Sequence, residues 1–309
     1  MQTAILTPQA ADLERMKALV LDGLGSPESR RAYSRALDDF LRWFQSQAPD
    51  GFTKATVNAY RSDLEARGLS PSTINIRLSA IRKLALEAAD NALMPRDLAA
   101  GISRVRGAKQ QGTRTGKWLM LAQAENLLAA PSPETLKGKR DRALLAVLVG
   151  CGLRRKEAAS LDLDLIQQRD GRWVIPDLVG KGGRIRTVPM PSWCRAAMEV
   201  WTTAAGITTG PVFRPVLKGG RVGAGRMTAQ TIFEAVRIYG AKIGVPDLAP
   251  HDLRRTFAKL AHKGRAALEQ IQLSLGHASI TTTERYLGVR QDLSDAPCDR
   301  LGLRVEVSP

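Results

Sequence analysis

Cysteine and histidine are scarce in this sequence, at three residues each in 309. The cysteines, Cys151, Cys194 and Cys298, have no metal-ligand spacing and cannot all pair, so we interpret them as buried or idle thiols in a reducing cytoplasm. The histidines form neither an HExxH motif nor a Cys/His cluster. These absences predict a protein without a metal ion, and no other cofactor is expected.

Long hydrophobic runs are also missing. The longest, ALLAVLVGCGL (143–153), is too short to cross a bilayer and predicts a buried helix. The first twenty residues carry acids early and lack a basic segment followed by a cleavage site, so no signal peptide is expected. With 44% hydrophobic and 25% charged residues, the chain has the composition of a soluble globular protein, long enough for two domains.

Acidic residues are outnumbered. Lys and Arg total 46 against 30 Asp and Glu, which gives a net charge of +16 and a pI near 10.3. Residues 1–107 carry a net charge of +3 and residues 108–309 a net charge of +13. Such a balance is typical of proteins that bind nucleic acid, and the second part of the chain carries most of it.

The first part of the chain predicts a small helical bundle at residues 1–107. Helices are expected over 26–47, 52–68, 70–91 and from Pro95 to about Ile102, because apolar residues recur at helical spacing after Ser, Thr or Ser-Pro starts. Several cations on the polar faces are candidate DNA contacts, although a solvated surface explains them equally well. They are Arg30, Arg31, Arg77, Arg82 and Lys83.

A change of composition follows at RVRGAKQQGTRTGKW (104–118), which is rich in glycine and cations and lacks apolar periodicity. We interpret residues 108–118 as a basic linker and 119–309 as a second domain with a C-terminal tail. Alternation of apolar and polar residues on both sides of a glycine-rich turn predicts a β-hairpin at 172–190. The fold class is therefore mainly α with a small β-hairpin or sheet (α+β). The other expected elements are helices near 121–130, 139–150, 192–205, 228–243, 251–263, 266–274 and 280–287.

Two glycine-rich segments present cations. In CGLRRKEAASL, Arg154 lies where a helix opens after a Gly-Cys-Gly turn, a position at which backbone and guanidinium can approach an anion together. In GKGGR, Lys181 lies at the tip of the predicted hairpin. A P-loop is excluded, because Ile175 and Gly182 occupy positions where that motif requires glycine and Ser or Thr. Taken alone, either cation is most simply a solvated side chain.

Two later segments carry the histidines. HDLRRTFAKLAHKG places His251 and Arg254 on one face at the start of a helix, with His262 expected to be structural or exposed. In LGHASITTTERYLG, His277 follows a tight turn and Tyr286 falls two turns into the next helix, which Ser279 caps. Taken alone, Tyr286 is more simply an aromatic anchor in a packed face than a catalytic residue.

In combination these segments resemble the tyrosine recombinase (phage integrase) family. The likeness covers Arg154, Lys181, His251-x-x-Arg254, Leu-Gly-His277 and Tyr286 in order, and the N-terminal bundle resembles the core-binding domain of that family. The departures are mild, since Arg155 and Lys156 add cations where the family often has smaller residues. No position of the set is replaced. Arg155 and Arg184 are further candidate DNA contacts.

The resemblance implies a site-specific DNA recombinase whose sites are carried by double-stranded DNA. Arg154, Arg254 and His277 are expected to donate hydrogen bonds to the scissile phosphate. Tyr286 is the expected nucleophile, His251 its base, and Lys181 the acid that protonates the leaving 5′ oxygen. The resemblance also implies a 3′-phosphotyrosine intermediate, a Holliday junction, and four protomers on two sites, without metal or ATP.

Two other functions remain open at this stage. A type IB topoisomerase would use the same nucleophile and phosphate-binding residues, and a DNA-binding protein could use the same fold without cutting. The N-terminal bundle and the spacing from LGH to Tyr286 favour the recombinase over the topoisomerase, and the intact residue set argues against a non-cutting protein. The tail after Tyr286 is expected to dock on a neighbouring protomer, and no additional arm-binding domain is expected.

Overall fold

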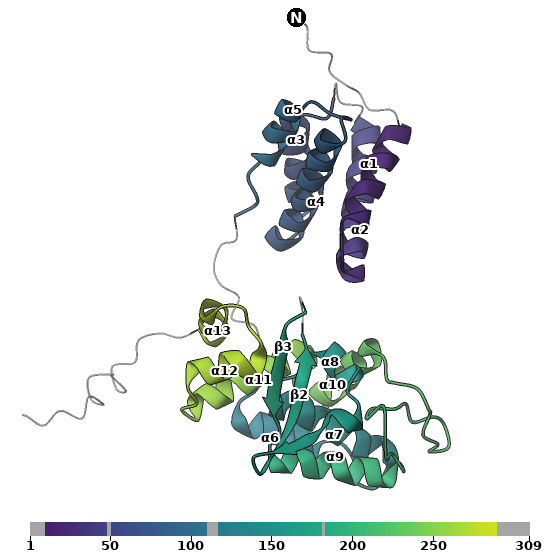
Figure 1. The fold of residues 1–309 in the computed structure, drawn as a ribbon, viewed down its shortest axis with the longest axis vertical. Coiled ribbons are helices and arrows are strands. Elements are labelled where there is room, and N and C mark those ends of the chain that lie inside the picture. The colour runs from purple at the N-terminus through teal and green to yellow at the C-terminus, as the bar shows by residue number, and fades with distance from the viewer. Residues whose placement is uncertain (1–9, 48–50, 110–116, 181–182, 289–309) are drawn as a thin grey trace, which may run out of the picture. The chain divides into compact units, whose positions relative to one another are not determined.

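The computed structural model describes residues 10–47, 51–109, 117–180 and 183–288. The chain divides into two compact units, Met1–Thr113 and Arg114–Pro309 (Figure 1). Both are built mainly from helices, and the second also contains a small sheet, which confirms the expected fold class. No helix of the described ranges is long and apolar enough to span a membrane.

The described part of the N-terminal unit consists of helices that begin where the sequence places their caps. Ser70 accepts a hydrogen bond from the backbone N–H of Thr73, and Thr53 accepts one from Thr56, so each satisfies a donor that a helix start leaves open. The first helix, α1, was not among the expected elements. The helices are α1 (Ala10–Asp22), α2 (Pro27–Gln47), α3 (Lys54–Ala66), α4 (Pro71–Asp90) and α5 (Arg96–Ser103).

An aromatic cluster forms part of the core of this unit. The ring centroid of Phe40 lies 5.1 Å from that of Tyr60 and 5.4 Å from that of Phe52, and all three side chains are buried. Tyr60 places its hydroxyl 2.6 Å from Asp39, whose carboxylate also pairs with Arg67 and Arg77. This network lets the phenol enter the core while its polar end stays hydrogen-bonded.

Residues 105–108 pack against the bundle, although the composition of 104–118 is that of a linker. Arg61 and Arg82 donate to the backbone carbonyls of Arg106 and Val105. Asn75 exchanges two hydrogen bonds with the backbone of Ala108, at 3.1 and 2.8 Å. Three side chains of α3 and α4 therefore fix the beginning of this segment to the N-terminal unit.

The C-terminal unit combines further helices with three strands. Most helix ends lie within two residues of the expected positions. Helix α7 begins three residues before the expected residue 139, because Thr135 is its N-cap and the Thr135 side chain accepts a hydrogen bond from the backbone N–H of Gly138. The elements are α6 (Leu121–Ala129), α7 (Leu136–Gly150), α8 (Arg155–Ala159), a 3-10 turn (Leu163–Leu165), β1 (Gln167–Arg169), β2 (Arg172–Val179), β3 (Ile185–Pro189), α9 (Ser192–Ala204), α10 (Ala229–Lys242), α11 (Pro250–Lys263), α12 (Leu268–Leu275) and α13 (Ile280–Leu287).

The strands form one antiparallel sheet in the order β1-β2-β3. The expected hairpin is its β2-β3 half, while β1 pairs with β2 through three exposed residues and has no apolar alternation that would reveal it. The register shifts between Ile175 and Leu178, where Asp177 adopts a φ of 51°. Irregularities of this kind interrupt the ladder and increase the local twist of a strand.

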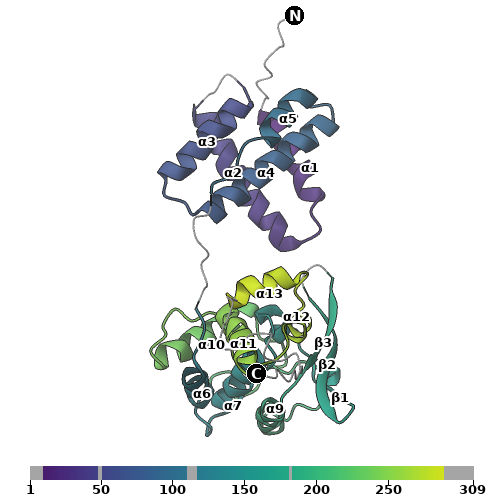
Figure 2. The ribbon, with the colours of Figure 1, turned by 90° about the vertical axis from the view of Figure 1, so that its left-hand side faces the viewer.

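Helix α7 runs through the core of the unit, with eleven of its fifteen residues buried. It packs against α9 and α11, and α11 in turn contacts α12 and α13. Helices α11, α12 and α13 pack against one another, and α12 also contacts β3 (Figures 1 and 2). This arrangement brings the histidine-bearing segments close to the turn that follows α7.

Candidate active site

The first arginine of the site is positioned by the start of α8. Arg154 is the N-cap residue, and its backbone N–H donates to Oε2 of Glu157 at 2.8 Å. Its Nη1 also donates to Oε1 of the same carboxylate at 2.7 Å. The Arg154 side chain is 30% exposed, so the guanidinium is held at one end and still open to a ligand.

Glu157 is a buried carboxylate between two guanidinium groups. Arg186 of β3 donates to it through Nη1 and Nη2, at 3.0 and 2.8 Å, and through Nε to the carbonyl of Ser274 at 2.8 Å. Burial by itself would raise the pKa of Glu157, but hydrogen bonds from Arg186 and Arg154 outweigh it and lower the pKa. The carboxylate is therefore ionised at neutral pH and orients both arginines.

The second arginine, Arg254 on α11, is almost entirely buried, at 1% exposure. It donates to the carbonyl of Gly152 at 2.6 Å and to the carbonyl of Leu275. Burial, with help from the charge of Arg154, lowers the pKa of Arg254 to about 10, which leaves it charged at neutral pH. Arg254 thus ties the turn before α8 to the end of α12.

His277 follows the turn that ends α12. Gly276 has a φ of 62°, and a Cβ atom built there would lie 2.8 Å from Cδ of Arg186, so only glycine fits this turn without displacement. Nδ1 of His277 lies 3.0 Å from Oγ1 of the buried Thr283. Burial and the charges of Arg254 and Arg154 lower the pKa of His277 to about 4, so the ring is neutral at neutral pH.

Tyr286 lies on α13, which Ser279 caps as expected. Its hydroxyl is 2.5 Å from Nε2 of His251, and its ring stands edge-on to those of His251 and His277, with centroids 5.3 and 5.1 Å away. Burial raises the pKa of Tyr286, although Arg254, Arg255 and Arg154 oppose this effect. The phenol is therefore protonated at neutral pH and needs a base before it can attack.

His251 is placed to be that base. It is the second residue of α11, after Pro250 at the first helical position. Burial, followed by the charges of Arg255 and Arg254, lowers its pKa, so the imidazole is neutral at neutral pH. A neutral ring whose Nε2 carries no proton can accept the phenolic proton across the 2.5 Å contact.

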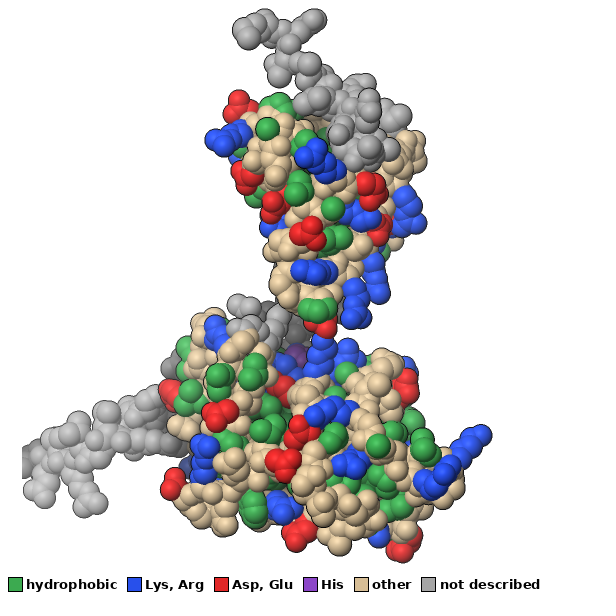
Figure 3. All heavy atoms as spheres, turned by 45° about the vertical axis from the view of Figure 1, so that its right-hand side comes forward, with side chains coloured by type: hydrophobic (Ala, Val, Ile, Leu, Met, Phe, Trp, Pro, Cys, Tyr) green, Lys and Arg blue, Asp and Glu red, His purple; other side chains and the backbone are tan. Residues whose placement is uncertain are grey.

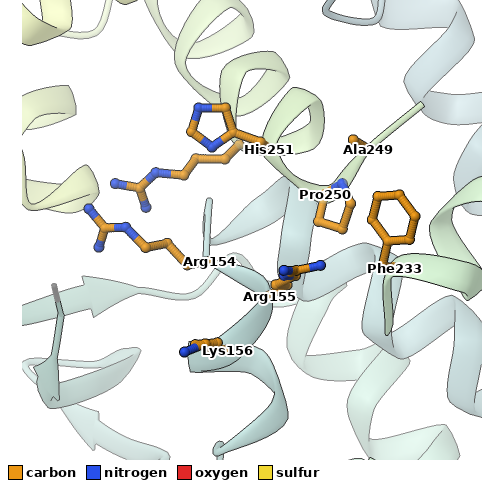
Figure 4. Close-up of a pocket in the computed structure, with 8 residues that line it drawn as sticks. Arg154, Arg155, Lys156, Phe233, Ala249, Pro250 and His251 are labelled. Carbon is orange, nitrogen blue, oxygen red and sulfur yellow. The ribbon is translucent and has the colours of Figure 1, made fainter. Parts of the chain in front are cut away.

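A pocket of about 420 Å³ opens beside these residues. Figure 4 shows the side chains that line it, with Arg154 before α8 and His251 on α11, Arg155 near Phe233, and Lys156 below Arg154. The guanidinium of Arg155 lies 5.8 Å from the Phe233 ring centroid. Arg154, Arg155, Lys156 and Arg254 line this pocket, so its wall is positively charged. Figure 3 shows Lys and Arg side chains at several places on the surface of this unit.

Five of the six predicted catalytic residues meet in this site, namely Arg154, His251, Arg254, His277 and Tyr286. The sixth, Lys181, lies outside the described residues. In the described ranges, no group of three or more His, Cys, Asp and Glu side chains is arranged to hold a metal ion. The geometry offers a nucleophile, a base and several hydrogen-bond donors, which is what phosphoryl transfer to a tyrosine requires.

The candidate DNA contacts fall into two groups. Arg77, Arg82 and Lys83 have partners within the N-terminal unit, namely Asp39, the carbonyl of Val105 and Glu87. Arg30 donates from Nε to the carbonyl of Leu24 at 2.6 Å but is exposed. Arg31, Arg155 and Arg184 are exposed as well. The exposed group, which consists of Arg30, Arg31, Arg155 and Arg184, is therefore more open to a ligand than Arg77, Arg82 and Lys83.

Sequence reasoning missed several residues that contact the site. Glu157 stands at the third helical position after Arg154, a capping spacing that could have revealed it. Thr283 is three residues before Tyr286 on α13, and Arg255 is four residues after His251 on α11. Residues at these spacings share a helix face, so the sequence could have indicated both. The sequence carries no local signal for Arg186, because this residue reaches Glu157 only through the tertiary position of β3, which packs against α12.

Comparisons with known proteins show to which family the chain belongs. The chain matches the phage integrase family over residues 117–292 and the N-terminal SAM-like domain of phage integrases over residues 16–92. It is 31% identical to tyrosine recombinase XerD of Caulobacter vibrioides over 282 residues, which cover 89% of this chain and 90% of that protein. It is 30% identical to tyrosine recombinase XerC of Pseudomonas fluorescens (strain Pf0-1) over 267 residues, 84% of this chain and 85% of that protein.

Solved structures share the fold. The XerH site-specific recombinase bound to its difH substrate aligns with a TM-score of 0.67 at 19% identity, covering 94% of this chain and 83% of that chain. The Tn1549 transposon integrase in complex with transposon right end DNA aligns with a TM-score of 0.69 at 17% identity, covering 94% and 99%. On the family matches and the relatives at about 30% identity, the chain belongs to the phage integrase family and is a tyrosine recombinase, an enzyme of site-specific recombination.

Proposed function

We propose that this protein cuts and rejoins double-stranded DNA at specific sites through a 3′-phosphotyrosine intermediate. The observation that carries the proposal is the contact of 2.5 Å between the Tyr286 hydroxyl and Nε2 of His251, beside the guanidinium groups of Arg154 and Arg254. The XerH and Tn1549 structures contain DNA, which supports DNA as the partner of this chain.

Attack begins when His251 accepts the phenolic proton and the Tyr286 oxygen forms a bond to the scissile phosphorus. Arg154, Arg254 and the N–H of His277 donate to the non-bridging oxygens, on which negative charge grows in the pentacoordinate transition state. The bond from phosphorus to the 5′ oxygen then breaks. Lys181 supplies the proton to that oxygen, which would be a poor leaving group as an alkoxide.

The products are a phosphotyrosine bond and a free 5′ hydroxyl, so the energy of the phosphodiester is kept. A 5′ hydroxyl from another strand reverses the step and joins the new strand, which requires no ATP. Two such rounds pass through a Holliday junction and exchange two duplexes. Four protomers on two DNA sites carry out the exchange. The tail expected to dock on a neighbouring protomer lies, beyond Gly288, outside the described residues.

The two units have different roles in this proposal. Residues 1–107 form the core-binding domain, residues 108–118 the basic linker, and residues 119–309 the catalytic domain with its tail. The separate family matches at 16–92 and 117–292 support this division. The exposed cations Arg30, Arg31, Arg155 and Arg184 contact DNA phosphates. Arg77, Arg82 and Lys83 are secondary candidates, because each has a partner within the N-terminal unit.

The test is covalent trapping on a library of nicked suicide duplexes with randomised sequence. We expect wild-type protein to form a denaturant-resistant adduct, Tyr286→Phe to form none, and the matched control Tyr33→Phe to form as much as wild type. Sequencing the attached DNA ends gives the site and the polarity of cleavage. If Tyr286→Phe traps as much DNA as wild type, the assigned nucleophile is wrong.

Two other outcomes identify the alternative functions. Relaxation of a supercoiled plasmid that lacks paired sites would indicate a topoisomerase of type IB. Sequence-selective binding without any adduct would indicate a DNA-binding protein that does not cut.

A further inference from the structure

The second arginine of α11, Arg255, lies against the ring of Tyr286. The guanidinium carbon of Arg255 is 4.7 Å from the centroid of the Tyr286 ring, over its face. The side chain is only 13% exposed, so the charge is largely removed from water. Arg255 is four residues after His251, and both therefore approach Tyr286 from the same face of the helix.

Asp252 holds this guanidinium in place. Its Oδ1 accepts from Nη1 of Arg255 at 3.3 Å, while its Oδ2 accepts from the backbone N–H of Ala249 at 3.0 Å. The carboxylate is thus fixed to the start of α11 and fixes Arg255 in turn. Nε of Arg255 is buried and has no hydrogen-bond partner among the described residues. The guanidinium is accordingly held by one carboxylate and one aromatic face.

We propose that Arg255 is a positioning residue for the nucleophile, because its cation over the ring of Tyr286 favours the phenolate over the phenol and fixes the ring against His251. A cation is attracted to the electron-rich face of an aromatic ring, and the attraction grows when the ring carries a negative charge. The contact is therefore stronger in the attacking form than in the resting form, which is the condition for acceleration. This inference rests on the proposed function.

The other charged groups around Tyr286 have different tasks. His251 contacts its hydroxyl, His277 stands at the ring edge, and Arg254 is engaged with two backbone carbonyls. Arg154 is paired with Glu157, and Asp252 is the one acid of α11 near the ring, already bound to Arg255. Lys181 lies outside the described residues. Among the described groups, Arg255 alone places a cation over the ring face.

The first test titrates Tyr286 in the intact protein without DNA. The chain has four tyrosines, so 13C labelling at the tyrosine ring gives a simple spectrum, and Tyr286→Phe assigns the signal. We expect Arg255→Met to move the titration midpoint of Tyr286 upward and Arg255→Lys, which keeps the charge, to move it less. The matched control is Lys263→Met, which removes an exposed cation from the same helix and should leave the midpoint unchanged.

The second test measures single-turnover cleavage of the mapped suicide duplex across pH. With less phenolate available, Arg255→Met should be roughly tenfold slower at neutral pH and approach wild type as pH rises, since one pH unit of midpoint corresponds to a factor of ten. Arg255→Lys should recover part of the rate. An equal loss at every pH, together with an unchanged midpoint, would show that Arg255 only supports packing and would overturn the inference.

The two proposals fail in different ways. Absence of a covalent adduct from wild-type protein overturns the proposed function and leaves the titration to decide the role of Arg255. A normal adduct with an unchanged Tyr286 midpoint in both Arg255 variants overturns the role of Arg255 alone. Thermal unfolding of each variant shows that the compared proteins are folded.

Discussion

The imidazole of His277 contacts one buried hydroxyl, that of Thr283. Because burial and nearby arginines keep the imidazole neutral, it carries a single N–H at neutral pH. To donate to a phosphate from Nε2, the ring must leave Nδ1 unprotonated, and the hydroxyl of Thr283, 3.0 Å away, can donate to Nδ1 in that state. We therefore expect Thr283 to donate to Nδ1 and to favour the tautomer that the proposed chemistry uses.

Replacing Thr283 tests whether its hydroxyl determines the tautomer of His277. Thr283→Val keeps the shape and loses the hydroxyl, and we expect single-turnover cleavage to fall about tenfold, as for the loss of one hydrogen bond of roughly 1.4 kcal/mol. Thr283→Ser should retain most of the rate. Histidine 15N chemical shifts report the tautomer directly. Unchanged shifts in Thr283→Val, with the rate lost, would assign Thr283 a packing role.

Glu157 makes stability depend on pH. Its pKa in the folded protein lies below its ordinary value of 4.5, so it contributes stability above that value, and the contribution is lost as pH falls through the folded pKa. Glu157→Gln leaves Arg186 buried without its carboxylate, and we expect a loss of about 3 kcal/mol at neutral pH. Urea unfolding at a series of pH values measures it. The difference from wild type should shrink below pH 4.5; a difference constant with pH would contradict the assignment.

At the scale of elements, helix positions could be predicted because their signals are local. Ser70 and Pro71 open α4, Thr53 caps α3, and Ser279 caps α13, each at the residue where the sequence placed it. The hairpin was predictable for the same reason, since alternation around a glycine-rich turn is a property of adjacent residues. The order of the chemistry-bearing segments was recognisable only as a family resemblance.

Contacts between elements could not be predicted. Nothing near Arg186 in the sequence indicates that it reaches Glu157 and the end of α12, because that contact depends on how β3 packs. Strand β1 has only exposed residues, so it lacks the alternation by which strands are found. The docking of residues 105–108 likewise depends on Asn75, about thirty residues earlier, while the local composition is that of a linker.

Two glycines that end helices provide a matched test of the turn before His277. Gly276 and Gly288 both have left-handed backbones, with φ of 62° and 57°, so alanine at either position costs about 1 kcal/mol. Only at Gly276 would the added Cβ approach Cδ of Arg186, at 2.8 Å. We expect Gly276→Ala to lower the free energy of unfolding more than Gly288→Ala, and to slow cleavage. If chemical denaturation gives equal losses in the free energy of unfolding for the two variants, the Arg186 side chain moves aside from the added Cβ atom at no measurable cost.

At the scale of the whole molecule, charge is distributed unevenly, with a net charge of +3 in residues 1–107 and +13 in residues 108–309. Binding of such a protein to DNA releases counterions from the phosphate backbone. The logarithm of the binding constant should therefore fall steeply as the logarithm of the salt concentration rises. The slope counts phosphate contacts, at about 0.9 for each. It therefore distinguishes cations that bind DNA from cations that support the fold.

This distinction applies to the candidate DNA contacts. Arg31→Ala and Arg184→Ala remove exposed cations, and each should reduce the salt slope by about one without changing the free energy of unfolding. Arg77→Ala should leave the slope unchanged and destabilise the protein, because Arg77 pairs with the partly buried Asp39. Fluorescence anisotropy on a short duplex at several salt concentrations gives the slopes. A flat dependence for wild type would contradict phosphate-led binding, and a reduced slope for Arg77→Ala would show that this arginine leaves Asp39 for DNA.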